Sequence, residues 1–208
     1  MPVNDYLNEL ISEIDGCESL RLHAVNHIVD SSTRSLIYES IILRAARAHE
    51  NFIESLFISY LTGEKTIEGN SIVTFVSPKD RQHARRLISS SIGSRFLDWS
   101  EASEVRNRCD IYFEEDSPLY TALSLISSEL SWIKKIRNQA AHDSVESRLA
   151  YKNVLQTILS VEPDPLPPAG DFLQMTPNRG HIKNREILAF FLDTLKSFAQ
   201  IASGKNVS

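Results

Sequence analysis

The sequence predicts a mainly all-α fold, an up-and-down helical bundle of four to five helices with a small β element near residues 72–76. Apolar residues recur at spacings of three and four along most of the chain, as they do on the buried face of a helix. The longest such stretch, residues 34–61, holds neither proline nor glycine. β-branched and aromatic residues gather at 72–76, shortly after a Gly-Asn turn signal. Stripes of this kind pack together as a helical bundle.

The first half of the chain is predicted to hold three helices around the β element. An amphipathic stripe covers residues 3–22 and is interrupted near Gly16. The long helix at 34–61 ends at Thr62-Gly63, and a further helix opens at 77–80. The long helix spans the domain, so we expect it to be the main packing partner of the helices that follow.

The second half is predicted to begin with a short helix at 101–113. Pro118 then starts another helix, at a position where proline is tolerated, and its apolar stripe runs to Ile136. After it, a capping box starts a further helix that ends near residue 160, and this box reads Asp143-Ser144-Val145-Glu146.

The C-terminal part is predicted to be an appendage. Residues 162–170 hold four of the eight prolines, which favours a semi-rigid, extended linker. Asn184 then caps a final helix at 185–202, whose stripe must dock on the core or on a partner and consists of Ile187, Leu188, Phe191, Leu195 and Phe198. We therefore divide the chain into a helical domain (1–160), a Pro-rich linker (161–183) and a docking C-terminal helix (184–208).

Composition and charge exclude several classes. With 208 residues, 42% of them apolar and 24% charged, the chain is long enough for a buried core and is not of the disordered type. Its net charge of −5 argues against a general nucleic-acid coating protein, because such proteins bind through many Lys and Arg residues. Two cysteines are too few for a disulfide framework. With no leader-like start and no long apolar run, we expect a cytoplasmic protein that does not enter a membrane.

Six residues after Ile136 carry the most informative chemistry, and they read Arg137-Asn138-Gln139-Ala140-Ala141-His142. They combine a permanent cation, an amide that donates and accepts, and an imidazole. On a straight helix, Asn138 and His142 lie on one face, whereas Arg137 lies about 140° around from His142. A bend brings all three together, and the small Ala140 and Ala141 let a second helix approach. These groups suit phosphodiester chemistry.

This motif resembles the R-x(4-6)-H motif of HEPN domains, helical proteins in which it lies between the third and fourth helices. Here it reads Arg137-Asn138-x-x-x-His142, and the resemblance covers roughly residues 30–160. Two further features resemble the HEPN branch found beside prokaryotic defence and toxin genes: the Ala141-His142 pair and a long helix with Arg44, Arg47, Glu50 and Asn51.

The resemblance implies a metal-independent endoribonuclease without a cofactor. His142 acts as general base or acid on the 2′-hydroxyl or the leaving oxygen, since histidine suits proton transfer near neutral pH. Arg137 stabilises charge on the phosphate through its fork of donors, and Asn138 positions the phosphate or His142. Attack by the 2′-hydroxyl leaves a 2′,3′-cyclic phosphate, so DNA is refractory.

Four more residues have supporting roles in this hypothesis. Lys134 and Lys135 precede the motif by less than one turn, and they either extend a phosphate-binding strip for RNA or form the solvated face of their helix. Glu50, with Asn51, either orients the motif from the long helix or joins a surface ion pair. A separate set of arginines either forms a surface that RNA approaches or keeps the protein in solution, and the acidic total favours the second interpretation; it consists of Arg81, Arg85, Arg86, Arg106 and Arg108.

The resemblance also implies partners. The family builds its cleft from two motifs that face each other across a homodimer, so the expected active site is composite. Such proteins resemble toxins or effectors in prokaryotic defence, and a partner, often a nucleotidyltransferase-like antitoxin, holds them in check.

Two other functions are left open. In the first, the same fold is a non-catalytic module for dimerisation or for holding RNA or a protein. In the second, the final helix is the functional part of an interaction scaffold through Phe190, Phe191 and Phe198, and the bundle stays folded when everything after residue 160 is removed. A metal site is not expected, because His23 and His27 have helical metal-ligand spacing but no third ligand accompanies them.

Overall fold

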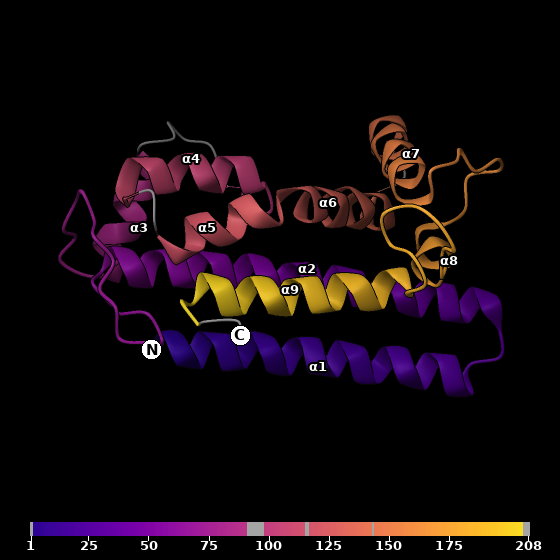
Figure 1. Cartoon of the computed structure of the whole chain (residues 1–208), viewed down its shortest axis with the longest axis horizontal. Helices are drawn as coiled ribbons and strands as arrows, with labels where there is room; N and C mark the ends of the chain where they lie inside the picture. The colour runs from indigo at the N-terminus through magenta and orange to yellow at the C-terminus, as the bar shows by residue number, and fades with distance from the viewer. Residues whose placement is uncertain (1, 91–97, 115–116, 143, 206–208) are drawn as a thin grey trace. The chain divides into compact units, whose positions relative to one another are not determined.

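The computed structural model describes residues 2–90, 98–114, 117–142 and 144–205, the side chain of Ser90 excepted. The described residues are 70% helical, which confirms the predicted, mainly all-α class. The described residues form nine helices, labelled in Figure 1. Their bounds are α1 Val3–His27, α2 Ser31–Leu61, α3 Arg81–Ser90, α4 Ala102–Tyr112, α5 Pro118–Leu125, α6 Ser127–Ala141, α7 Val145–Leu159, α8 Ala169–Leu173 and α9 Ile187–Ala202.

Two predicted features of the helices are wrong. α1 runs through Gly16 without a break. That position is exposed and a Cβ there would meet no atom within 4 Å, so glycine costs the helix only its intrinsic penalty of about 1 kcal/mol. The helix predicted from Pro118 to Ile136 is divided, because Ile126 leaves helical geometry (φ −125°, ψ 30°) between α5 and α6. Pro118 does start α5, with Ser117 as its N-cap.

The small β element at 72–76 is not confirmed. Thr74 forms an isolated antiparallel bridge with Phe113, and none of the described residues belongs to a strand. Val73 and Phe75 are 55% and 62% exposed, so the β-branched and aromatic residues here are not covered by a second strand. The up-and-down order of the helices stays a prediction.

The chain separates into two compact units. Unit 1 comprises residues 1–12, 49–127 and 196–208, and unit 2 comprises residues 13–48 and 128–195. The division falls inside α1, α2 and α9, so each of these helices contributes residues to both units. It also falls beside the break between α5 and α6. The predicted boundaries at residues 160 and 183 do not coincide with it.

Unit 1 contains an aromatic cluster around Phe57. The ring centroid of Phe57 lies 4.7 Å from that of Phe113 and 5.9 Å from that of Tyr112. The end of α9 belongs to the same unit, because the hydroxyl of Tyr60 donates a hydrogen bond to the carbonyl of Ala202 (2.7 Å). The last turn of the final helix is therefore part of this core.

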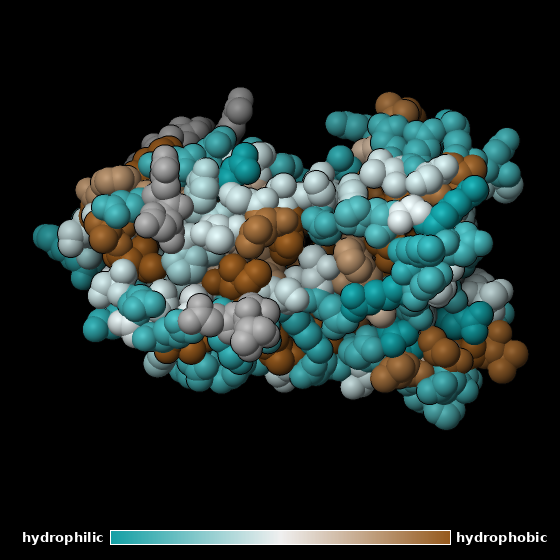
Figure 2. Space-filling model, in the orientation of Figure 1, coloured by the Kyte–Doolittle hydropathy of each residue, from teal (hydrophilic) through white to brown (hydrophobic). Residues whose placement is uncertain are grey.

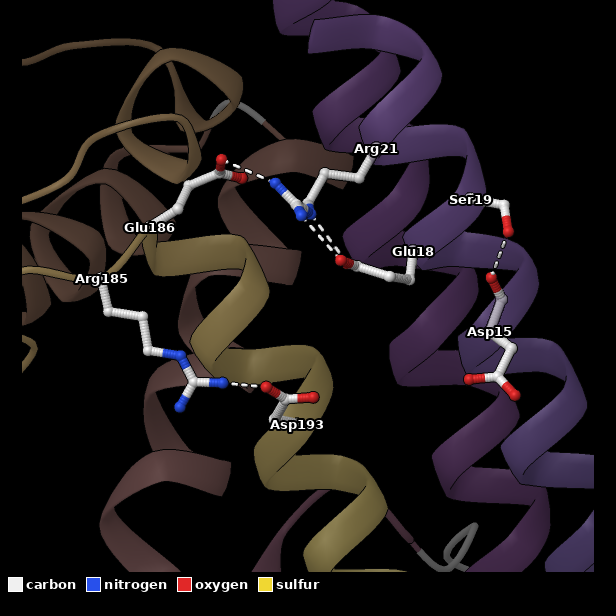
Figure 3. Close-up of polar contacts among 7 residues, drawn as sticks. All are labelled: Asp15, Glu18, Ser19, Arg21, Arg185, Glu186 and Asp193. Atoms are coloured by element: carbon white, nitrogen blue, oxygen red, sulfur yellow. Dashed lines mark hydrogen bonds and ion pairs between the residues drawn. The ribbon is translucent and has the colours of Figure 1, made fainter.

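Unit 2 contains an ionic cluster that joins α1 to the start of α9. The guanidinium of Arg21 pairs with Glu18 on its own helix (2.6 Å) and with Glu186, the residue before α9 (2.8 Å), as Figure 3 shows. The side chain of Arg21 is only 11% exposed, so losing either carboxylate leaves a largely buried cation undercompensated. Burial and the carboxylate of Glu186 raise the pKa of Tyr38 to about 12.

The predicted linker is folded in part. It contains α8, in which four of five residues are buried. The backbone N–H of Gly170 donates to Oε1 of Glu39 (3.1 Å), and a Cβ at Gly170 would lie 2.0 Å from the carbonyl oxygen of Ser35. This close approach to α2 requires a glycine, and it docks the segment on unit 2.

The final helix places most of its apolar side chains in the core. It begins at Ile187, and Asn184 does not cap it, because Asn184 is left-handed (φ 57°) and its N–H donates to the carbonyl of Pro177 (2.7 Å). All five residues of the predicted stripe are 0% exposed, among them Phe191 and Phe198. Their burial contradicts one part of the scaffold hypothesis, that the bundle stays folded without residues 161–208, since this removal would strip apolar side chains from both units; Phe190 is half-buried.

Among the described residues, no helix combines the length and low charge that a membrane span requires. Cys17 and Cys109 are both buried and free.

His49 is a buried histidine of unit 1. It is 5% exposed, its ring lies 4.7 Å from that of Phe198 in an edge-on contact, and its Nε2 has no hydrogen-bond partner among the described residues. Burial lowers the pKa of His49 to about 3. At a pH between about 3 and 6.5, the ring therefore stays neutral in the folded protein, whereas it is protonated in the unfolded chain.

We expect the free energy of unfolding to fall as the pH drops below about 6.5, by up to about 1.4 kcal/mol per pH unit, because only the unfolded chain then binds a proton at His49. This contribution to stability is fully present above the pKa of His49 in the unfolded chain. It is lost as the pH falls toward the pKa of His49 in the folded protein. Urea unfolding of His49→Leu should show a shallower acid slope than wild type, and the exposed His27→Ala should keep the wild-type slope. An unchanged slope in His49→Leu would contradict the neutral, buried state.

Candidate functional site

The motif lies at a helix junction in unit 2. α6 carries Arg137 and Asn138, His142 follows its last residue, and α7 begins three residues later. Arg137 and Asn138 are half-buried and His142 is exposed. The side of α6 opposite Asn138 and His142 faces the core through Leu130, Trp132, Ile133 and Ile136. Burial of this stripe turns Asn138 and His142 toward the surface and leaves Arg137 at its edge.

Two serines fix the turn at which His142 lies. Ser144 is the N-cap of α7: its Oγ accepts from the N–H of Ser147 (3.1 Å), and its own N–H donates to Oγ of Ser147 (3.1 Å). The hydroxyl of Ser147 donates to the carbonyl of His142 (2.6 Å). The cap is thus one residue later than predicted, and Asp143 lies outside the described residues. The N–H of His142 donates to the carbonyl of Asn138 (2.9 Å), so its backbone is held on both sides.

A side-chain hydrogen bond joins the first two motif residues. Nη1 of Arg137 donates to Oδ1 of Asn138 (2.9 Å). This bond uses the acceptor of the amide, so the NH₂ group of Asn138 is what it offers to a ligand. Arg137 therefore reaches the side chain of Asn138 without a bend in the helix.

Asn138 and His142 line one hollow of about 310 Å³, as their i and i+4 spacing predicts. Lys135 lines it too, and neither its ammonium nor the imidazole of His142 has a hydrogen bond or ion pair within the described part of the chain. The other described residues around the hollow are Ser144, Glu146, Ser147 and Ala150. A space with an imidazole, an amide and an ammonium can hold an anion and move a proton.

Four predicted site residues are not among the described residues that line this hollow. Arg137 is linked to the hollow through its hydrogen bond to Asn138. Lys134 is half-buried and precedes Lys135, which lines the hollow. Glu50 and Asn51 belong to unit 1, whereas the motif belongs to unit 2. Their orienting role stays a prediction.

Glu146 also lines the hollow, although the sequence pattern predicts only a capping role for it. It is exposed and has no partner within the described ranges. A carboxylate and an imidazole in one space can serve as an acid and base pair. The signal that could have found Glu146 is its place in the first helical turn after His142.

No cluster of three or more metal-ligating side chains lies in the described part of the chain. The rings of His23 and His27 are 4.7 Å apart and both residues are exposed. No protein-family model, curated protein or solved structure matches the chain.

Ser144→Ala and Ser147→Ala should each lower the free energy of unfolding by about 1 kcal/mol, because each removes one half of the cap. Amide hydrogen exchange in the first turn of α7 should become faster. Ser71→Ala is the control, since Ser71 is exposed and has no hydrogen bond within the described ranges. A destabilisation of Ser144→Ala no larger than that of this control would contradict the structural role of the cap.

Proposed function

We propose that the chain is a metal-independent endoribonuclease of HEPN type, acting as a toxin or effector in prokaryotic defence. The observation that supports this best is the hollow that Lys135, Asn138 and His142 share, with Arg137 bonded to Asn138. Donors and cations suit the non-bridging oxygens of a phosphodiester, and an imidazole suits proton transfer. A neutralising antitoxin of the nucleotidyltransferase-like kind belongs to the same proposal and rests on the motif resemblance.

The proposed reaction is an internal displacement at phosphorus. The 2′-hydroxyl gives its proton to a general base while its oxygen bonds to the neighbouring phosphorus, and the 5′-oxygen leaves with the electron pair of the broken bond and takes a proton from a general acid. The products are a 2′,3′-cyclic phosphate and a 5′-hydroxyl. Arg137 and Lys135 stabilise the charge that builds up on the phosphoryl oxygens, and the NH₂ of Asn138 positions them.

This reaction needs an acid as well as a base, and one hollow holds one imidazole. Glu146 lines the same hollow, and a second copy of the chain would bring a second His142. The exposure of Val145 and Leu149, 89% and 61%, favours the second source. These apolar side chains lie one turn apart in the first half of α7, three and seven residues after His142, where a second copy would cover them.

Purified wild type should cleave total RNA and tRNA in EDTA and leave 2′,3′-cyclic phosphate ends. His142→Ala should lower the rate by roughly 100- to 10,000-fold, the usual contribution of a general acid or base, and Arg137→Ala should also abolish most cleavage. His27→Ala, which removes an exposed histidine of α1, should cleave like wild type. End-group analysis and single-turnover rates are the measurements.

Cleavage that persists in His142→Ala, or that also occurs on DNA of the same sequence, would overturn the proposed mechanism. If wild type binds RNA without cutting it, the non-catalytic module is the correct function. Circular dichroism of each variant establishes whether an inactive variant is still folded.

The composite site predicts that wild type is a dimer in light scattering and that Val145→Asp with Leu149→Asp makes it monomeric and inactive, because two carboxylates cannot be buried unpaired in an interface. The matched control is Val29→Asp with Leu36→Asp, also one valine and one leucine of unit 2, 95% and 64% exposed. If only the control pair dissociates the dimer, the interface lies at the α1–α2 turn and not at α7. A monomeric wild type would contradict the composite site.

A further inference from the structure

The segment between α8 and α9 carries a concentration of positive charge that the proposed reaction does not use. Residues 178–185 read Asn-Arg-Gly-His-Ile-Lys-Asn-Arg and include no acid. The basic residues stand at alternate positions and are all exposed: Arg179, His181, Lys183 and Arg185. In a chain with a net charge of −5, a local run of this kind is what a polyanion would contact.

The segment is held in one conformation by its backbone. Gly180 has a φ of 86°, and a Cβ there would lie 2.0 Å from the carbonyl oxygen of Ile158, near the end of α7. Asn184 is also left-handed, and its N–H donates to the carbonyl of Pro177 (2.7 Å). A restrained backbone loses less conformational entropy when the segment binds a ligand.

The segment also packs on the motif helix. Nε2 of His181 lies 3.2 Å from Oε1 of Glu129, and the His181 ring meets the Trp132 ring edge-on, with centroids 4.8 Å apart. Both partners belong to the first half of α6 and, like the segment, to unit 2. Trp132 lies on the core-facing side of α6 and precedes the hollow residues Asn138 and His142 by six and ten residues, or roughly 9 and 15 Å along the helix axis. A single strand of several nucleotides is long enough to contact both the segment and the hollow.

Two of the four basic side chains are already engaged. Arg185 pairs with Asp193 on α9 (Figure 3), and His181 is held by Glu129. By contrast, Arg179 and Lys183 have no ion pair or hydrogen bond within the described ranges. The surface over the segment and α8 is largely hydrophilic in Figure 2. Two unpaired cations thus face solvent in the unit that holds the motif.

We propose that residues 178–185 are a second RNA-contact surface, in which Arg179 and Lys183 hold phosphates several nucleotides away from the one that is cleaved. This inference rests on the proposed function of the hollow. RNA is favoured over an acidic protein because the exposed ring of His181 lies among the cations, and bases stack on such rings.

The test is binding of a fluorescein-labelled, mixed-sequence single-stranded oligoribonucleotide, measured by anisotropy at several salt concentrations. All variants carry His142→Ala, so that cleavage does not interfere. Arg179→Gln with Lys183→Gln should weaken binding on every sequence and reduce the slope of log K against log salt by about 1.4, or about 0.7 for each single-strand phosphate that the protein no longer neutralises. His181→Ala should weaken binding roughly 5- to 150-fold if its ring stacks on a base.

The matched control removes the same charge elsewhere, through Lys65→Gln with Arg86→Gln. Both residues are exposed and unpaired within the described ranges of unit 1, and Arg86 belongs to the arginine set that is the rival RNA surface. If both double variants bind RNA equally weakly, the effect is one of net charge and the inference is overturned. An unchanged salt slope in the Arg179→Gln, Lys183→Gln variant would also overturn it. Polyglutamate and unlabelled RNA are compared as competitors. Equal displacement of the labelled RNA by both would show a general polyanion surface and would overturn the assignment to RNA.

Cleavage assays on the same substitutions with His142 intact separate this inference from the proposed function. If wild type cleaves and the segment variant cleaves and binds equally well, the segment inference fails and the nuclease stands. If the segment variant no longer binds but wild type cleaves nothing, the RNA surface stands and the catalytic proposal fails. If neither the wild type nor any variant binds RNA, both the segment inference and the proposed function fail.

Discussion

Both units depend on the burial of the apolar side of α9. Complete burial of a Phe or Leu side chain contributes about 1.5–3 kcal/mol, and this helix places five fully buried large side chains in the chain's two cores. Polar contacts fix its two ends: Arg21 holds Glu186 before the first turn, and Tyr60 holds the carbonyl of Ala202 in the last. Because the helix is anchored in this way, the preceding segment is held against α6 and α7 instead of hanging free as a linker would.

The hollow, in turn, depends on how α6 gives way to α7. Helix geometry alone sets the side chains of Asn138 and His142 on one face, but His142 lies beyond the last residue of α6, where a chain end would fray. Ser144 and Ser147 replace the missing helical bonds, and Ser147 accounts for the carbonyl of His142 as well. The reactive side chain is thus left unbonded while its backbone is restrained, which is the combination that proton transfer requires.

Local sequence patterns are enough to predict some of these features and not others. The helical class, the course of α2 and the shared face of Asn138 and His142 follow from periodicity, which each stretch encodes by itself. The break at Ile126 does not, because Ile126 belongs to the apolar stripe and no proline or glycine marks the end of a helix there. The prolines before α8 predict a spacer, although only the tertiary contact between Gly170 and Ser35 shows that the segment docks. The basic run at 178–185 is visible in the sequence, but its place beside α6 is not.

Gly180 gives this surface an evolutionary signature. Its left-handed backbone and the carbonyl of Ile158 against it exclude every side chain, so folding alone requires glycine there in any protein that shares this unit. Folding makes no such demand on Arg179 and Lys183, whose side chains have no bonds within the described part of the chain. In related sequences Gly180 should be kept whatever the ligand is. Arg179 and Lys183 should be kept only in those proteins that still bind a polyanion.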